Sequence, residues 1–333
     1  MRRILLVFVV LLAIVSCNRQ IENSRTKVNL IFDTDFGPDY DDVGALALVH
    51  ALADSGYVQI LATLSSNLDE RVIPCLEIIN TYYGRAYIPL GATKRDNGVR
   101  QTSWQTKKWS ELLPEKYSHT VSCTSEAPDA VKVYREILSQ SEDKAVTICS
   151  VGFLTNLRDL LESGPDEYSP LTGRELIERK VLRMVVMGGT FPNGEDCFNF
   201  KMDASAASAV IAQWPTEIIF SGQEIGDKIR TGKHLIAEQI EDNPVKDVYK
   251  LCMEQGEPEG RMSWDQTAAL VAIKGVAPYY NMVRGRLIYD EDGMGYWEND
   301  IHGKDGYIVE KTPPQEMSQI IEAYMMQKPK TNQ

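Results

Sequence analysis

Five acidic side chains crowd into ten residues near the start of the chain: Asp33, Asp35, Asp39, Asp41 and Asp42. A largely apolar run, 28–32, precedes them and Gly37-Pro38 divides them, which predicts a strand, a turn and then a helix over Val43–Ala53. Carboxylates this close repel one another, and either raised pKa values or a bound cation relieves the repulsion. One aspartate could simply cap the helix. The whole cluster favours a cation or proton-transfer site.

The rest of the chain repeats strands and helices in alternation, which predicts one α/β domain over residues 28–328 with a mostly parallel sheet flanked by helices. Residues 93–124 show no clear periodicity and predict a long loop, and 231–261 predicts a polar helical segment. The carboxyl ends of parallel strands meet at one edge, where open α/β sheets bind ligands. Small or polar residues follow the predicted strands there, after Phe32, Leu64, Ile148, Met187 and Phe220.

The candidate cation ligands are oxygen donors. Asp35, Asp42 and Asp265 have no histidine or cysteine at metal-binding spacing, which favours Ca²⁺, with Mg²⁺ the weaker candidate. Ca²⁺ also accepts backbone carbonyls, and Gly152 could let the carbonyl of Val151 approach such an ion.

Composition limits the classes of function. The chain has 333 residues, 43% of them hydrophobic, which is enough for a sizeable core in one large domain or two smaller ones, and the continuous alternation favours one. A formal net charge of −12, with lysines and arginines scattered, argues against nucleic acid as a partner. A homo-oligomer is compatible with the sequence, which does not specify one.

The amino terminus predicts export. Arg2 and Arg3 precede the apolar run Ile4–Val15, which is short for a membrane span and typical of a signal peptide over 1–16. The stretch ending at Cys17 resembles a bacterial lipobox, so we expect lipid on Cys17 and a polar tether over 17–27, with an acyl anchor as the only contact with a bacterial membrane. A plain signal peptide with a chance cysteine is the alternative. The spacing of the remaining cysteines makes a zinc site improbable.

Three motifs together resemble the nucleoside hydrolase family, in its inosine-uridine preferring type. They are Asp33-Thr34-Asp35-Phe36-Gly37 with Asp41-Asp42, then 151–156, then Met187-Gly188-Gly189, and the likeness runs over about 29–273. The resemblance implies a single α/β domain with a tightly bound Ca²⁺ that hydrolyses the N-glycosidic bond of ribonucleosides.

The resemblance also implies roles for individual residues. Asp35 matches the general base and a metal ligand, able to deprotonate a Ca²⁺-bound water, and the other ligands are Asp42, Asp265 and the Val151 carbonyl. Asp33 matches a supporting carboxylate. The residues matched to ribose contacts are Asp41, Asn67, Asn199 and, more loosely, Asn193.

The sequence departs from the family pattern at three places. Two extra residues lie in the aspartate loop, so Asp39 could replace Asp41 as a contact. Cys197 stands where many members have a sugar-binding Glu. Trp264 precedes Asp265 where the inosine-uridine type has a His that acts on the leaving base; it resembles the purine-preferring type, in which an indole stacks on the base, although a tryptophan at a helix start can equally be a core residue. No leaving-group acid is identified.

Two alternatives to a nucleosidase remain. Asp33-Thr34-Asp35 after an apolar strand also looks like the nucleophile loop of haloacid-dehalogenase-type phosphatases, with Asp33 as nucleophile and Mg²⁺ as cofactor, although this leaves Asp41, Asp42 and Asp265 unexplained. A lipoprotein that binds a nucleoside or sugar without turnover is the other. The glycoside substrate could also be something other than a common nucleoside.

Overall fold

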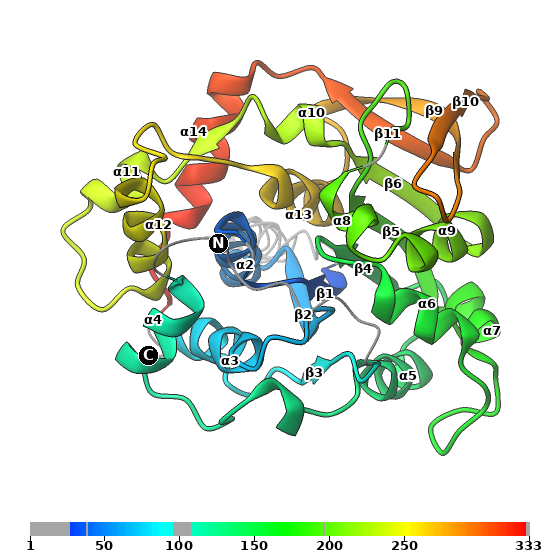
Figure 1. The fold of residues 1–333 in the computed structure, drawn as a ribbon, viewed down its shortest axis with the longest axis horizontal. Helices are drawn as coiled ribbons and strands as arrows, with labels where there is room; N and C mark the ends of the chain where they lie inside the picture. The colour runs from blue at the N-terminus through cyan, green and yellow to red at the C-terminus, as the bar shows by residue number, and fades with distance from the viewer. Residues whose placement is uncertain (1–26, 38, 96–107, 196, 331–333) are drawn as a thin grey trace, which may run out of the picture.

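A nine-stranded sheet forms the centre of the protein (Figure 1). The computed structural model describes residues 27–37, 39–95, 108–195 and 197–330. Neighbouring strands are parallel except at β9, which is antiparallel to both β10 and β11. Across the sheet the order is β10 (Gly295–Asn299), β9 (Tyr280–Tyr289), β11 (Asp305–Glu310), β6 (Glu217–Ser221), β5 (Val181–Met187), β4 (Val146–Ser150), β1 (Val28–Thr34), β2 (Val58–Ser65) and β3 (Leu90–Ala92).

Helices cover both faces of this sheet, because its central strands are apolar on both sides. Along β1, Leu30 and Phe32 belong to one hydrophobic cluster and Ile31 to the other, as strand alternation requires. The first cluster includes α2 (Asp41–Asp54), α3 (Val72–Tyr82), α4 (Trp109–Lys116), α12 (Pro244–Glu254), α13 (Trp264–Lys274) and α14 (Pro314–Met325). The second includes α5 (Ala130–Gln140), α6 (Thr155–Glu162), α7 (Gly173–Lys180) and α9 (Ala204–Gln213).

Short elements complete the fold. They are η1 (Thr124–Glu126), α8 (Phe198–Met202), α10 (Gln223–Gly226), α11 (Lys233–Ala237) and the separate two-stranded sheet of β7 (Arg230–Thr231) and β8 (Arg261–Met262). The single α/β domain with a mostly parallel sheet is therefore confirmed.

The strand order places a topological switch point beside β1. The chain passes from β1 to β2 on one side and reaches β4 on the other, so the connections diverge at the carboxyl end of β1. A crevice opens at such a point, and ligands bind there. Because β1 runs directly into Asp35, the aspartate cluster lies at this position.

Several local predictions were wrong in detail. Residues 93–124, predicted as a long loop, contain the helix α4, and 231–261, predicted as helical, contains two separate helices, α11 and α12, between β7 and β8. In α4, Trp109 is fully buried and its ring meets that of Phe36 edge to face at 5.0 Å. Contacts distant in sequence stabilise such short elements, and local periodicity does not reveal them.

The described residues include no helix long and apolar enough to cross a bilayer. The predicted signal peptide, Cys17 and the tether up to residue 26 lie outside the described part of the chain.

His50, inside α2, gives the fold a measurable pH dependence. Its Nε2 pairs with Asn80 Oδ1 at 2.9 Å, and its ring stacks on Tyr83 at 4.6 Å. Burial, followed by the charge of Arg85, lowers the pKa of His50 to about 3. Below pH 6.5, His50 is therefore protonated in the unfolded chain, whereas in the folded chain it stays neutral down to about pH 3.

The free energy of unfolding should consequently fall by about 1.4 kcal/mol per pH unit between these two values through this group alone. Urea titrations at pH 7 and pH 5 test this, with His50→Gln as the comparison. We expect the variant to lose about 2 kcal/mol less than the wild type over that interval. Equal losses would show that His50 does not titrate in this way.

Candidate active site

A cavity of about 220 Å³ opens at the carboxyl end of β1. Its lining comes from the β1–α2 loop, from the ends of β4 and β5, and from the start of α13. The lining residues are Asp35, Asp39, Asp41, Asp42, Val151, Met187, Phe198, Asn199, Gln223, Arg261, Trp264 and Asp265. A volume of this size suits a small ligand.

All four predicted metal ligands lie in this lining: Asp35, Asp42, Asp265 and Val151. Burial, and then neighbouring carboxylates, hold the pKa of Asp35, Asp42 and Asp265 well above the ordinary range. In the described part of the chain none of these three forms a salt bridge with a lysine or arginine. Uncompensated, buried oxygen donors fit a hard divalent cation, which would restore their charged forms.

The carboxylate of Asp39 extends this donor set. Oxygens of Asp39, Asp41 and Asp42 all lie within 4.8 Å of one another. Asp39 differs from the others because it forms a salt bridge with Arg261, Nη2 to Oδ2 at 3.0 Å. Burial alone would raise the pKa of Asp39, but the Arg261 charge together with hydrogen bonds from Asp41 and Arg261 outweighs it, so the pKa lies below the ordinary value. The two-residue insertion thus contributes a charge-compensated carboxylate.

Asp42 and Asp265 are positioned by contacts between β1, α2 and α13. The hydroxyl of Thr34 donates to Asp42 Oδ1, tying the start of α2 to the end of β1. One oxygen of Asp41, Oδ2, accepts the backbone N–H groups of Trp264 and Asp265, each at 3.0 Å. Asp41 therefore caps the first turn of α13 from a different helix. Sequence reasoning did not assign these roles to Thr34 or Asp41.

Asp33, predicted as a supporting carboxylate, is buried next to the strand end that carries Asp35. Its carboxylate accepts from Tyr134 Oη at 2.9 Å and from Asn156 Nδ2 at 3.1 and 3.2 Å. Burial raises the pKa of Asp33 to about 7 even though both hydrogen bonds oppose the rise. It is fully buried and is not part of the cavity lining.

Asn199 and Val151 are joined across two strand ends. The Asn199 amide donates to the carbonyl of Val151 at 2.8 Å and to that of Met187 at 3.2 Å. A carbonyl oxygen has two lone pairs, so Val151 retains one for a cation. The side-chain oxygen of Asn199 remains an acceptor for a ligand hydroxyl.

Gly152 is required by a close approach of two chain segments. A Cβ there would lie 2.3 Å from the backbone nitrogen of Asp35, 2.6 Å from the carbonyl carbon of Thr34 and 2.7 Å from Ser66 Oγ. Moving backbone atoms costs more free energy than moving the end of a flexible side chain. Any side chain at position 152 must therefore displace the loop that carries Asp35.

We expect Gly152→Ala to lower the free energy of unfolding by about 1–3 kcal/mol, as overpacking does, and to reduce turnover by moving Asp35. Urea unfolding and a turnover assay measure the two effects. Gly164→Ala is the matched control, because a Cβ there meets nothing within 4 Å. Similar behaviour of the two variants would contradict the prediction.

Two predicted contacts are not brought into the cavity lining. Asn67 is fully buried and donates to the backbone carbonyl of Asp35 at 2.9 Å, so it supports the aspartate loop. Asn193 is exposed and donates to Glu195 Oε1 at 3.0 Å. Cys197, at the sugar-binding position, is also outside the lining and accepts the Gly189 N–H at 3.1 Å.

Trp264 lines the cavity and is firmly held. Its indole Nε1 donates to Asp227 Oδ1 at 2.8 Å, and a Cβ on Gly226 would lie only 2.3 Å from its Cδ1. The guanidinium of Arg261 lies over the indole, 4.8 Å from the ring centroid. Sequence reasoning missed Arg261, and its only signal was a basic residue three positions before Trp264.

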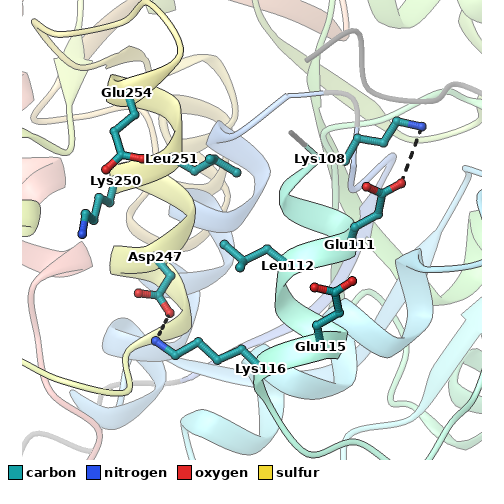
Figure 2. Close-up of a pocket in the computed structure, with 9 residues that line it drawn as sticks. All are labelled: Lys108, Glu111, Leu112, Glu115, Lys116, Asp247, Lys250, Leu251 and Glu254. Atoms are coloured by element: carbon teal, nitrogen blue, oxygen red, sulfur yellow. Dashed lines mark hydrogen bonds and ion pairs between the residues drawn. The ribbon is translucent and has the colours of Figure 1, made fainter. Parts of the chain in front are cut away.

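A larger depression, of about 440 Å³, lies between α4 and α12 (Figure 2). Opposite charges alternate along it, and Lys116 Nζ pairs with Asp247 Oδ2 across the two helices at 2.7 Å. Among its described lining residues, no carboxylates come together as Asp39, Asp41 and Asp42 do in the smaller cavity. The smaller cavity is therefore the candidate site.

The fold is an open α/β sheet, and a cavity of buried oxygen donors lies at its switch point. These two features are typical of α/β proteins that bind a cation and a small ligand at the carboxyl ends of the strands. The family model described as inosine-uridine preferring nucleoside hydrolase matches residues 30–299. The chain belongs to this family. Comparison with curated proteins finds no match.

Solved structures of similar fold include nucleoside hydrolases. A plant nucleoside hydrolase is 17% identical, with 90% of this chain and 99% of that one covered at a TM-score of 0.65. An inosine-uridine preferring nucleoside hydrolase from Bacillus anthracis gives the same identity, coverage and TM-score. A purine-preferring ribonucleoside hydrolase from Gardnerella vaginalis is 15% identical, and the match covers 90% of this chain and 99% of that one at a TM-score of 0.63. Identities this low support the fold, while the family model identifies the family.

Proposed function

We propose that this protein hydrolyses the N-glycosidic bond of ribonucleosides to free base and ribose. One observation carries the proposal: the aspartates at the end of β1, the Val151 carbonyl after β4 and Asp265 on α13 all line a single cavity. Membership of the nucleoside hydrolase family supports the same reaction class.

The donor set supports Ca²⁺ as the cofactor, held by Asp35, Asp42, Asp265 and the Val151 carbonyl. When bound, Ca²⁺ would lower the pKa of a water molecule and take ribose hydroxyls into its oxygen shell. Asp35 accepts a proton from the attacking water while the oxygen of that water bonds to the anomeric carbon. The surrounding carboxylates stabilise the positive charge that develops on the ribose.

We propose that Asp41 and Asn199 hold ribose hydroxyls. Asp41 uses Oδ2 to cap α13, so Oδ1 is the oxygen that would accept a ribose hydroxyl. Asn199 uses its amide nitrogen on backbone carbonyls, so its oxygen is available to a hydroxyl donor. These contacts fix the sugar relative to Asp35.

We propose a preference for purine nucleosides, supported by Trp264 in the cavity lining. A large flat base gains more from an aromatic wall than a small one. Because Arg261 lies over the indole ring, the wall is a cation–π pair rather than a bare indole.

The position of Asp33 argues against the phosphatase alternative. A nucleophile must reach the substrate, but this carboxylate is fully buried, hydrogen-bonded to Tyr134 and Asn156, and outside the cavity lining. A non-catalytic nucleoside binder keeps the same cavity and differs only in turnover, so an assay decides between them.

A reducing-sugar assay against purine and pyrimidine nucleosides, with Ca²⁺ or with a chelator, tests the function. We expect ribose release in the presence of Ca²⁺, highest for purines, and its loss on chelation. Nucleoside binding by calorimetry without ribose release would favour the binder. Phosphate release from phosphomonoesters without ribose release would favour the phosphatase.

We further propose that the protein is exported and anchored to a bacterial membrane by lipid on Cys17, on the strength of the signal-like run and the lipobox resemblance. Val28 begins β1 at the end of the strand opposite the cavity. Metabolic labelling with a fatty acid should mark the wild type and not Cys17→Ala. Equal labelling of both would exclude this anchor.

A further inference from the structure

Among the residues that the structure describes, the cavity lining shows no obvious group to assist departure of the leaving base. None of the four histidines, at positions 50, 119, 234 and 302, belongs to its lining. Among lining donors, the Asn199 amide is engaged by two carbonyls and the Trp264 indole N–H by Asp227, and the side-chain amide of Gln223 is uncharged. Within the described lining, Arg261 is the only cation.

Arg261 is fixed in the wall of the cavity. It lies on β8, pairs with Thr231 of β7, and is 8% exposed. Its Nη1 donates to Glu257 Oε1 and its Nη2 meets Asp39 Oδ2, each at 3.0 Å. With the Trp264 ring 4.8 Å from its central carbon, the guanidinium is restrained by two carboxylates and an aromatic face.

These contacts leave hydrogen-bonding capacity unused. A guanidinium carries five N–H groups, and the two carboxylates engage one on each terminal nitrogen. The buried Nε has no hydrogen-bond partner among the described residues. An unsatisfied buried donor is costly, and a ligand that supplies an acceptor removes that cost.

The charge state of Arg261 defines what it can do. Burial lowers the pKa of the guanidinium, but the charges of Asp39 and Asp41 outweigh burial and raise the pKa above its ordinary value. Arg261 therefore remains protonated and cannot transfer a proton as a general acid. It can donate hydrogen bonds and place positive charge beside an acceptor.

We propose that Arg261 stabilises the negative charge that develops on the leaving nitrogen heterocycle as the glycosidic bond breaks. This inference rests on the proposed nucleosidase function. The electron pair of the C–N bond passes to the heterocycle, water oxygen bonds to the anomeric carbon, and Asp35 takes the water proton. Solvent then protonates the departing heterocycle while Arg261 keeps its own protons.

The competing explanation is structural: Arg261 would only tie the Asp39 insertion to Glu257. Substrates with different leaving groups separate the two roles. A natural purine nucleoside expels a basic heterocycle that needs stabilisation. A 4-nitrophenyl β-D-ribofuranoside expels a phenolate whose nitro group already delocalises the charge, so help from the protein matters little. A displaced Asp39 loop would impair both substrates alike.

The test measures kcat/KM of wild type, Arg261→Gln and Arg261→Lys on inosine and on the nitrophenyl riboside. For Arg261→Gln we expect a loss of about 10²–10³-fold on inosine, as for removal of one charge-stabilising donor, and little change on the riboside. Arg261→Lys should recover part of the inosine activity. Calcium titration calorimetry and thermal unfolding show whether the cation site and fold are intact in each variant.

Arg230→Gln is the matched control. Arg230 pairs with the same Glu257, Nη1 to Oε2 at 3.1 Å, but lies outside the cavity lining. The Arg230→Gln variant should therefore be as active as the wild type on both substrates. Equal losses on inosine and the riboside in Arg261→Gln, or no loss on either, would overturn the proposal. So would an effect confined to inosine 5′-monophosphate, which would make Arg261 a phosphate contact. Wild-type protein that cleaves neither substrate would instead overturn the proposed function itself.

Discussion

Asp35→Asn is expected to reduce ribose release from a purine nucleoside by at least about 10³-fold, because it removes the proposed general base and a cation ligand together. The amide keeps the size of the side chain. Initial rates at saturating Ca²⁺ and nucleoside measure the effect. Asp143→Asn is a suitable control, since Asp143 is exposed and pairs with Arg179 and Lys180 on the surface, outside the cavity lining.

The same substitution should leave the metal-free protein as stable as the wild type or more stable. Burial, followed by the charge of Asp39, raises the pKa of Asp35, so the buried carboxylate is a cost to folding without a cation. Thermal unfolding in chelator tests this. Retention of more than a tenth of the wild-type rate in Asp35→Asn would refute the assigned role, and the stability measurement excludes unfolding as the cause of any loss.

Ca²⁺ is expected to raise the unfolding temperature strongly, and more so at pH 8 than at pH 5. At a free concentration about 1,000-fold above the dissociation constant, a ligand that binds only the folded state adds about 4 kcal/mol. The pKa values of Asp35, Asp41, Asp42 and Asp265 are raised in the metal-free protein, so its stability falls as pH rises and these carboxylates ionise against one another. A bound cation removes that loss.

Differential scanning calorimetry with Ca²⁺, Mg²⁺ or chelator at the two pH values measures the effect. Mg²⁺ should stabilise less, because it demands a stricter octahedral shell and retains its waters. Asp265→Asn should reduce the Ca²⁺ increment, since Asp265 reaches the cavity from α13. An increment that is the same at both pH values, or absent, would contradict an all-carboxylate calcium site.

The candidate ligands could be proposed from sequence because they are chemically conspicuous. Asp35 and Asp42 lie within ten residues after an apolar strand, and the fold rule for parallel sheets places that strand end at a ligand edge. Asp265 and the Val151 carbonyl were proposed as further oxygen donors, and the structure brings both residues into the same cavity. For these residues, local pattern and tertiary position agree.

The predictions for Asn67 and Asn193 show where the pattern lacked the necessary information. Both follow strands or glycines at the correct edge, yet one side chain turns to the backbone of Asp35 and the other pairs with Glu195. Side-chain direction depends on the rotamers that neighbouring loops permit, and spacing along the chain does not encode it.

The sequence by itself determined the α/β class and the oxygen-rich chemistry at the ends of the predicted strands, because each depends on local periodicity and residue type. Only the tertiary structure decided how those groups divide the work. Asp41 became a cap for α13, and Asp33, which the family resemblance had matched to a supporting carboxylate, is held by Tyr134 and Asn156. Arg261 lies on a short strand far along the chain, beside Asp39 and over Trp264. The contacts of Asp41 with α13 and of Asp39 with Arg261 join residues more than two hundred positions apart, and electrostatic compensation of that kind exists only once the chain has folded.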